Sequence, residues 1–218
     1  MRKDDIIESI RYRGFNINIG YDIDAESPRT WDNLGTMICF HNRYRLGDAH
    51  DLCSSDFEDW EDMERHIRKT YKPAVLHPLY LYDHSGITIR TAPFGCRWDS
   101  GQVGFVFATR TDILAAYGAK RLSKKLIAHA DKCILNEVKE YDSYLTGEVY
   151  RYEVKSPLGK EIDQCCGYYG DRDKNGIVAD AKAAVDAEIK WRKEHTHCLL
   201  GKFSKQVKFT KVAPAQKV

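Results

Sequence analysis

Three aspartates in one short segment have the spacing of a metal site. Asp22 and Asp24 form an Asp-x-Asp pair, and Asp32 follows in the same polar segment. Paired carboxylates can hold Mg²⁺ for phosphoryl or nucleic-acid cleavage chemistry, and His41 and Asp48 are the nearest candidates for a third ligand and a base. Aspartates are also common in loops because they form Asx turns. The segment therefore leaves two alternatives, a Mg²⁺-dependent nucleic-acid-processing site and a loop without chemistry.

Cysteine and histidine are plentiful, but their spacing is not that of a structural zinc site. The chain has seven cysteines and eight histidines, without the two CxxC-like pairs that such sites use. The adjacent Cys165 and Cys166 would point to opposite faces of a strand. Cys96 has only the neighbouring Arg97 to activate it, and no nucleophile elbow, P-loop or dinucleotide-binding turn is present. We predict no catalytic residue, no metal and no cofactor.

Arginines interleaved with aromatic residues form the clearest binding pattern in the chain. They lie in polar segments at 21–33, 42–45 and 93–100. Such residues stack on bases and contact phosphates in nucleic-acid-binding proteins, and they are equally typical of protein–protein hot spots. The residues that we predict to contact a partner are Trp31, Asp32, Arg43, Tyr44, Phe94, Arg97 and Trp98.

The charge distribution favours a protein partner over a nucleic acid. The net charge is +2, with eight acids and no Lys or Arg from Asp48 to Glu64. A near-neutral total argues against a strongly basic nucleic-acid binder, and the acidic segment predicts a helix that contributes to the contact surface or imitates a phosphate surface. The basic run from Lys120 to Lys125 extends the Arg/aromatic set and keeps nucleic-acid binding as the alternative.

The stretch from His77 to Arg110 organises the expected fold. Alternating or apolar runs predict strands, and their short connections favour antiparallel pairing. The strands are expected at 15–19, 35–41, 79–82, 87–91, 103–109, 148–155 and 161–169, and the helices at 3–12, 54–70, 111–117, 123–145 and 177–194. This order predicts an α+β fold, in which an antiparallel or mixed sheet of about six strands packs against two long helices and one or two shorter ones.

Length and composition suggest one core in a reducing compartment. A chain of 218 residues suits a single hydrophobic core. We predict one domain over residues 1–200 and a basic tail over 201–218, in which lysines would protect an edge strand. No run approaches the ~20 apolar residues of a membrane span, no apolar signal segment opens the chain, and the unframed cysteines are typical of the cytoplasm.

Three blocks of the chain resemble a group of uncharacterised tailed-phage and prophage proteins. These blocks are Thr30 to Asp48 (TWDNLGTMICFHNRYRLGD), Thr88 to Arg110 (TIRTAPFGCRWDSGQVGFVFATR) and Glu161 to Asp171 (EIDQCCGYYGD). The resemblance implies a small phage accessory protein that acts in the cytoplasm of the host cell. Such proteins commonly disarm a host nuclease, a CRISPR complex or another defence system. The resemblance assigns no catalytic residues.

Two functional hypotheses follow. The first is a non-enzymatic protein that binds and inhibits a host protein, as an anti-CRISPR or anti-restriction factor would, or binds a phage protein. The second is a nucleic-acid-binding or Mg²⁺-dependent nucleic-acid-processing protein that uses the Arg/aromatic set. A homodimer formed through a sheet edge is a third alternative, and no membrane partner is expected.

Overall fold

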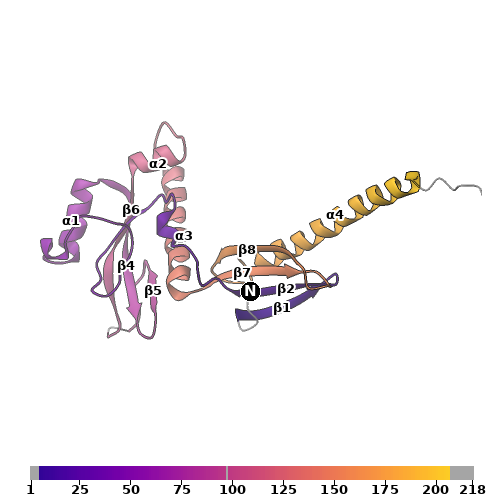
Figure 1. The fold of residues 1–218 in the computed structure, drawn as a ribbon. Coiled ribbons are helices and arrows are strands. Elements are labelled where there is room, and N and C mark those ends of the chain that lie inside the picture. The colour runs from indigo at the N-terminus through magenta and orange to yellow at the C-terminus, as the bar shows by residue number, and fades with distance from the viewer. Residues whose placement is uncertain (1–4, 97, 207–218) are drawn as a thin grey trace, which may run out of the picture. The chain divides into compact units, whose positions relative to one another are not determined.

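The computed structural model describes residues 5–96 and 98–206, with side chains described up to residue 195 (Figure 1). The described part contains eight strands and four α-helices. The elements, in chain order, are β1 (Ile6–Tyr12), β2 (Phe15–Tyr21), the short 3₁₀ helix η2 (Pro28–Thr30), β3 (Thr36–Cys39), η3 (Ser54–Asp56), α1 (Trp60–Thr70), β4 (Pro73–Asp83), β5 (Ile87–Arg90), β6 (Ser100–Thr109), α2 (Arg110–Ala116), α3 (Lys124–Thr146), β7 (Val149–Lys155), β8 (Glu161–Tyr169) and α4 (Ile177–Gln206).

The α+β class is confirmed, but the predicted single sheet of about six strands is wrong. The described strands form two separate four-stranded sheets, with the orders β1-β2-β7-β8 and β3-β6-β4-β5. Two long helices, α3 and α4, accompany the shorter α1 and α2. The strands number more than expected because the segment read as a short first helix is itself a strand.

The chain divides into two compact units. Unit 1 comprises Met1–Gly20, Tyr152–Cys165 and Gly176–Val218, whereas unit 2 comprises Tyr21–Arg151 and Cys166–Asn175. The predicted single domain over residues 1–200 stays a prediction. In the predicted tail, residues 201–206 form the end of α4 rather than an edge strand, and residues 207–218 lie outside the described part of the chain.

Unit 1 begins with a β-hairpin where an amphipathic helix was predicted. Arg13 and Gly14 both have positive φ, 48° and 85°, and Tyr12 pairs directly with Phe15. A two-residue turn with two positive φ angles matches the twist of antiparallel strands, so the chain reverses instead of coiling. Gly14 therefore belongs to a hairpin turn, and the helix predicted at 3–12 is wrong.

The hydrophobic interior of unit 1 combines its strands with the first turns of α4. Ile17 and Ile19 in β2 are fully buried, and so are Ile177, Ala181 and Val185 at a spacing of four residues along α4. That spacing places the three side chains on one helix face. Figure 1 shows the beginning of α4 beside β7 and β8.

Unit 2 is built on the sheet β3-β6-β4-β5, which carries hydrophobic cores on both faces. β6 pairs antiparallel with β3 and β4, and β4 pairs antiparallel with β5. One core includes Val106 and Leu79 with Ile134 and Val138 of α3, and the other joins Phe105 and Phe107 to Met63 and Ile67 of α1. The predicted strand at 103–109 therefore belongs to β6, a central strand covered on both faces.

The start of α1 differs from the prediction, whereas the ends of α3 agree with it. Asp59 caps α1 by accepting a hydrogen bond from the Asp62 amide at 2.7 Å, so the helix begins after η3 and not at Ser54 or Ser55. Ser123 caps α3, and Gly147, with φ of 75°, ends it. Side-chain caps and left-handed glycines are the local signals of helix ends.

Cys39, at the end of β3, is expected to make the stability of the folded protein depend on pH in the alkaline range. Its side chain lies in the core on the α3 face, and burial, assisted by the Asp48 charge, raises the pKa of this thiol from 9.0 to about 12. Above pH 9.0 the unfolded chain loses this proton while the folded chain keeps it. The free energy of unfolding should therefore fall with rising pH in this window, by about 1.4 kcal/mol per pH unit from this group.

Denaturant titrations of the wild type and Cys39→Ala, under reducing conditions, test this expectation. The alanine variant loses some packing, but its stability should vary less with pH above 9.0 because its unfolded state releases one proton fewer. Other alkaline groups contribute equally to both proteins and cancel. Parallel pH profiles for the two proteins would contradict the assignment.

Candidate functional site

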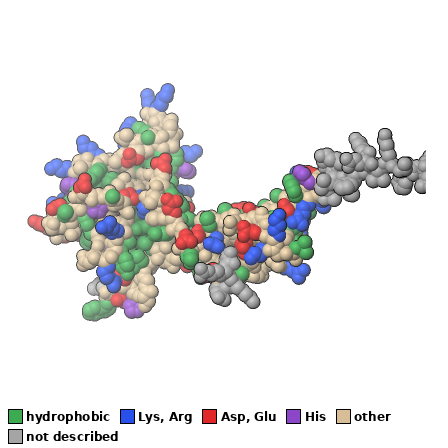
Figure 2. Space-filling view, viewed as in Figure 1, with side chains coloured by type: hydrophobic (Ala, Val, Ile, Leu, Met, Phe, Trp, Pro, Cys, Tyr) green, Lys and Arg blue, Asp and Glu red, His purple; other side chains and the backbone are tan. Residues whose placement is uncertain are grey.

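Four of the predicted contact residues lie at one end of the sheet in unit 2. The surface is formed by the β4–β5 turn, the β5–β6 connection and the loop after β3. We call this the tip surface, and define it as His41, Arg43, Tyr44, Tyr82, Asp83, His84, Arg90, Phe94, Trp98 and Asp99. Figure 2 shows hydrophobic and His side chains at the end of unit 2 where β4 and β5 meet.

The β4–β5 turn supports the tip surface. Ser85 has a positive φ of 59°, and the His84 amide donates to the Gly86 carbonyl at 3.1 Å. The Asp83 amide donates to the Asp99 carbonyl at 2.8 Å, which joins this turn to the β5–β6 connection. The turn therefore anchors one side of the longer connection that carries Trp98.

Asp83 organises the loop after β3. Its carboxylate accepts a hydrogen bond from the Arg43 guanidinium, and this bond raises the pKa of Arg43. The same carboxylate lies 3.6 Å from Nε2 of His41. The amides of Arg43 and Tyr44 donate to Nδ1 of His41 at 3.2 and 3.3 Å, so the imidazole carries its proton on Nε2, toward Asp83.

Aromatic stacking holds the rest of the tip surface. The rings of His41 and Tyr44 stack with centroids 5.2 Å apart. The guanidinium of Arg90 lies 3.8 Å from the Phe94 ring centroid, and it donates to the backbone carbonyls of Ala92 and Pro93 at 2.8 and 2.5 Å. These contacts hold the first residues of the β5–β6 connection, which is longer than an ordinary hairpin loop.

Trp98 is the outstanding member of the tip surface. Its side chain is 96% exposed. Nearby residues on both sides of it are hydrogen-bonded to one another: Cys96 donates from Sγ to the Asp99 carboxylate at 3.5 Å, and Ser100 donates to the Cys96 carbonyl. Arg97 lies outside the described residues. A large apolar ring as exposed as this one can be buried only by another molecule or by a rearrangement of the loop.

A pocket of about 410 Å³ adjoins the tip surface under the loop after β3. His41, Tyr44, Arg45 and His50 line it, together with residues of β3. The loop folds back against β3 at Gly47, where φ is 71° and an added Cβ would lie 2.6 Å from the Met37 carbonyl oxygen. Only glycine fits this close approach without strain. The pocket can receive one side chain of a bound molecule.

Trp31 and Asp32 do not join the tip surface. Trp31 contacts the ring of Tyr169 edge-on, with centroids 5.1 Å apart, and Asp32 beside it is exposed. Within the described residues, no hydrogen bond, ion pair or ring contact connects either of them to the tip surface. The structure therefore groups Arg43, Tyr44, Phe94 and Trp98, and places Trp31 and Asp32 elsewhere in unit 2.

The aspartates considered for Mg²⁺ have separate surroundings. Asp22 accepts a hydrogen bond from the Gly167 amide at 3.1 Å, whereas Asp24 is exposed. The Asp48 carboxylate accepts a hydrogen bond from Arg29 at 2.7 Å, so its charge is already paired within the protein. Among the described side chains, no three His, Cys, Asp or Glu residues are grouped as ligands for one ion.

The acidic helix is less one-sided than its sequence suggested. Within α1, Asp62 pairs with Arg65 at 3.1 Å and Glu64 pairs with Arg68 at 2.7 Å. The acid-only segment ends at Glu64, and the following residues of the same helix include Arg65 and Arg68. The predicted phosphate-like surface is therefore partly neutralised by its own helix.

Sequence reasoning missed Asp83, His84 and Asp99 as members of the site. The alternation of Tyr80 and Tyr82 was a usable signal, because it places aromatic side chains on one face of β4 close to the turn that carries Asp83 and His84. The pairing of Asp83 with Arg43 depends on tertiary contacts and left no local signal.

Comparison with protein-family models, with curated proteins and with solved structures found no match to the chain. Within the residues that the structure describes, no helix combines the length and the apolar character needed to cross a membrane.

Proposed function

We propose that this protein is a non-enzymatic binding protein that engages another protein through the tip surface. The observation that carries the proposal is the 96% exposure of Trp98 on a connection whose neighbouring residues are hydrogen-bonded. Exposed Trp, Tyr and Arg side chains dominate the energy of protein interfaces when a partner buries them.

The chemistry of the tip surface supports a protein partner with a mixed polar and apolar face. Arg43 and Asp83 form a pair at the surface, in which the Arg43 side chain is 63% exposed and the Asp83 side chain 20% exposed. Such a pair stabilises the free protein little, so it can exchange for contacts with a partner at small cost. Tyr44, 40% exposed, adds an aromatic ring with a hydroxyl at the rim of the adjoining pocket.

The resemblance to tailed-phage proteins supplies the proposed context. In that context the partner is a protein of the host cell, and the effect of binding is to inhibit a defence system such as a CRISPR complex or a restriction enzyme. The proposed site of action is the host cytoplasm. Cys96 donates its hydrogen bond to the Asp99 carboxylate and not to an imidazole, which supports binding over nucleophilic catalysis.

Replacing Trp98 with alanine is expected to abolish partner capture. Truncating a central Trp of an interface commonly costs at least ~2 kcal/mol, or about thirtyfold in affinity. Trp191→Ala is a matched control, because Trp191 is a 54% exposed tryptophan on α4 in unit 1. Tagged wild-type protein and both variants would be expressed in bacteria, captured from nuclease-treated lysates, and compared by quantitative mass spectrometry.

The expected result is one host protein that the wild type and Trp191→Ala retain in stoichiometric amount and Trp98→Ala loses. Titration of that purified partner should reproduce the loss as a weaker Kd. The proposal fails if the three proteins capture the same set. It also fails if light scattering shows that Trp98→Ala disrupts only self-association, because the tip surface would then be a homodimer interface.

A further inference from the structure

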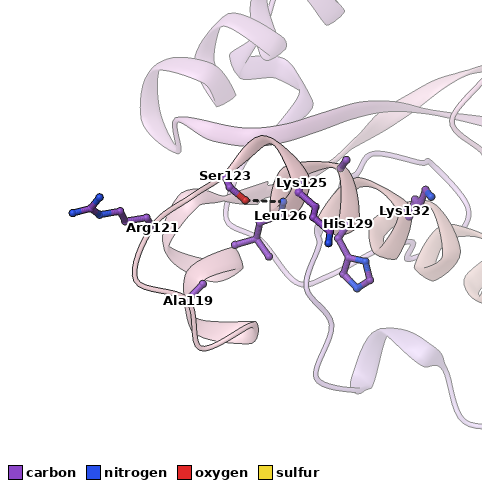
Figure 3. A pocket seen from close by; sticks show the side chains of 8 residues that line it. Ala119, Arg121, Ser123, Lys125, Leu126, His129 and Lys132 are labelled. Carbon is purple, nitrogen blue, oxygen red and sulfur yellow. Dashed lines mark hydrogen bonds between the residues drawn. The ribbon is translucent and has the colours of Figure 1, made fainter.

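A second pocket in unit 2, which we call the α3 hollow, lies where the α2–α3 connection meets the first turns of α3. Its volume is about 490 Å³, within the usual range for small-molecule sites. Ala119, Leu126 and Ala128 contribute apolar atoms, whereas Lys125, His129 and Lys132 surround them with basic groups. Figure 3 shows that Lys125, His129 and Lys132 leave successive turns of α3, and that Ser123 is already engaged in capping the helix.

Positive charge is concentrated around this hollow. Residues 119–132 include five cations, Lys120, Arg121, Lys124, Lys125 and Lys132, and the single acid Asp131. The Asp131 carboxylate is bound to Nε2 of His77 at 2.6 Å. Among the described residues, no ion pair joins these five cations to an acid. Figure 2 shows Lys and Arg side chains projecting from the end of unit 2 that carries this connection.

The charged surface continues beyond the α3 hollow. A neighbouring pocket of about 460 Å³ lies against the same part of α3 and shares Ala128 with the α3 hollow. Its charged lining residues are Lys124, Arg68, which pairs with Glu64, and Asp131, which is bound to His77. Lys125 and Lys132 are seven residues apart, which corresponds to about 10 Å along a helix. The cations thus border two adjoining hollows instead of converging on one point, which suits an extended polyanion better than a single small anion.

We propose that this surface binds single-stranded nucleic acid, with one base in the apolar hollow and phosphates at Lys125 and Lys132. Single-strand-binding proteins combine a positive groove for the backbone with pockets or rings for unpaired bases. Duplex bases are stacked inside the helix and cannot enter such a hollow. The site is independent of the tip surface, because it lies near the Pro73 end of β4 and the tip surface lies at the Asp83 end.

His129 is the residue that would contact the base. Its side chain is exposed, and its ring is held edge-on against Tyr117, with centroids 5.2 Å apart. A ring fixed in this way offers a flat face for stacking without first losing rotamer freedom. Lys125 and His129 are one helical turn apart, so a base on the ring places its phosphate within reach of a lysine.

Fluorescence anisotropy with short labelled oligo-dT and oligo-U, titrated with the full chain, tests this proposal. The pocket variant is the double substitution Lys125→Gln/Lys132→Gln. The control variant is Lys139→Gln/Lys190→Gln, which makes the same change of charge at exposed helix positions outside the hollow. Each lost phosphate contact should reduce the slope of log affinity against log salt concentration by about 0.7. This corresponds to roughly fivefold lower affinity at 0.1 M salt. His129→Ala should weaken binding at least about fivefold through lost stacking.

The expected pattern is binding of oligo-dT or oligo-U by the wild type and the control variant, with weaker binding by both pocket variants. The lysines of the C-terminal tail are present in every protein, so they contribute a common background. The proposal is overturned if wild-type protein does not bind at low salt, or if the pocket and control variants bind equally. It is also overturned if duplex DNA binds as tightly as single strands, or if polyglutamate competes equally at matched charge.

Discussion

Alanine at position 104 is expected to unfold unit 2, whereas alanine at position 101 of the same strand should leave it folded. A Cβ on Gly104 would lie 1.9 Å from the carbonyl oxygen of Ile38 and 2.9 Å from the Cα of Cys39. Both neighbours are backbone atoms of β3, so the clash can be relieved only by moving β3 away from β6. That movement would open both cores, and we expect a loss above ~3 kcal/mol.

Gly101 is a sharp control for this substitution. No atom lies within 4 Å of its added Cβ, so Gly101→Ala changes the same residue type in the same strand without a clash. Urea titrations followed by circular dichroism would compare both variants with the wild type. A difference below about 0.5 kcal/mol between them, the usual range for surface substitutions, would contradict the close approach of β3 and β6.

Removing the buried guanidinium of Arg29 is expected to have an effect of similar size. Its side chain is only 5% exposed and lies between two carboxylates. It donates to both oxygens of Asp48 at 2.8 and 2.7 Å and to the Gly35 carbonyl at 2.6 Å, and its Nη1 lies 3.9 Å from Glu137. Arg29→Leu leaves two carboxylates without their cation, so we expect a loss of about 3–5 kcal/mol.

These carboxylates have further structural roles that magnify the effect. Glu137 accepts hydrogen bonds from the Leu34 and Gly35 amides at 2.7 and 2.9 Å, and Asp48 accepts one from Met37 at 2.8 Å. Together they fasten η2 and the start of β3 to α3. Loss of Arg29 should therefore loosen the connection between the η2 segment and the helix.

Arg68→Leu provides the comparison for Arg29→Leu. Arg68 pairs with Glu64 at 2.7 Å, but the two side chains are 58% and 39% exposed, and such pairs contribute less than ~1 kcal/mol. Adding Asp48→Asn to Arg29→Leu should recover part of the stability, because it removes one uncompensated charge. Equal losses for Arg29→Leu and Arg68→Leu in denaturant titrations would refute the importance of burial.

The two proposed binding surfaces lie at opposite ends of one strand. β4 begins at Pro73, which lines the pocket next to the α3 hollow, and ends at Asp83, which pairs with Arg43. Eleven residues of strand span about 33 Å. The Arg/aromatic set that the sequence presented as one group is therefore divided. Tyr44, Phe94 and Trp98, with Arg43, belong to the tip surface, whereas Trp31 contacts Tyr169. The lysine-rich part lies in the α2–α3 connection and the first turns of α3.

Local signals sufficed for the elements whose ends are capped within the chain itself. The predicted helix at 123–145 corresponds to α3, which Ser123 caps and Gly147 ends. The predicted strands at 148–155 and 161–169 correspond to β7 and β8, and the turn between them includes a hydrogen bond from the Gly159 amide to the Ser156 carbonyl at 2.9 Å. The alternation of residues 87–91 located β5 to within one residue. Each of these signals acts over a few residues and needs no tertiary partner.

The sequence by itself thus determined the α+β class, the long helices and the residue types that could bind a partner. Tertiary structure alone decided that Ile6–Tyr12 is a strand, since Ile6 and Ile10 share a face in a helix and in a strand alike, and only pairing with β2 selects the strand. It also decided that the strands form two sheets, and that Arg43 meets Asp83 while Trp31 meets Tyr169. The physical reason is that periodicity is a local property, whereas strand pairing and ion pairing join residues far apart in the chain.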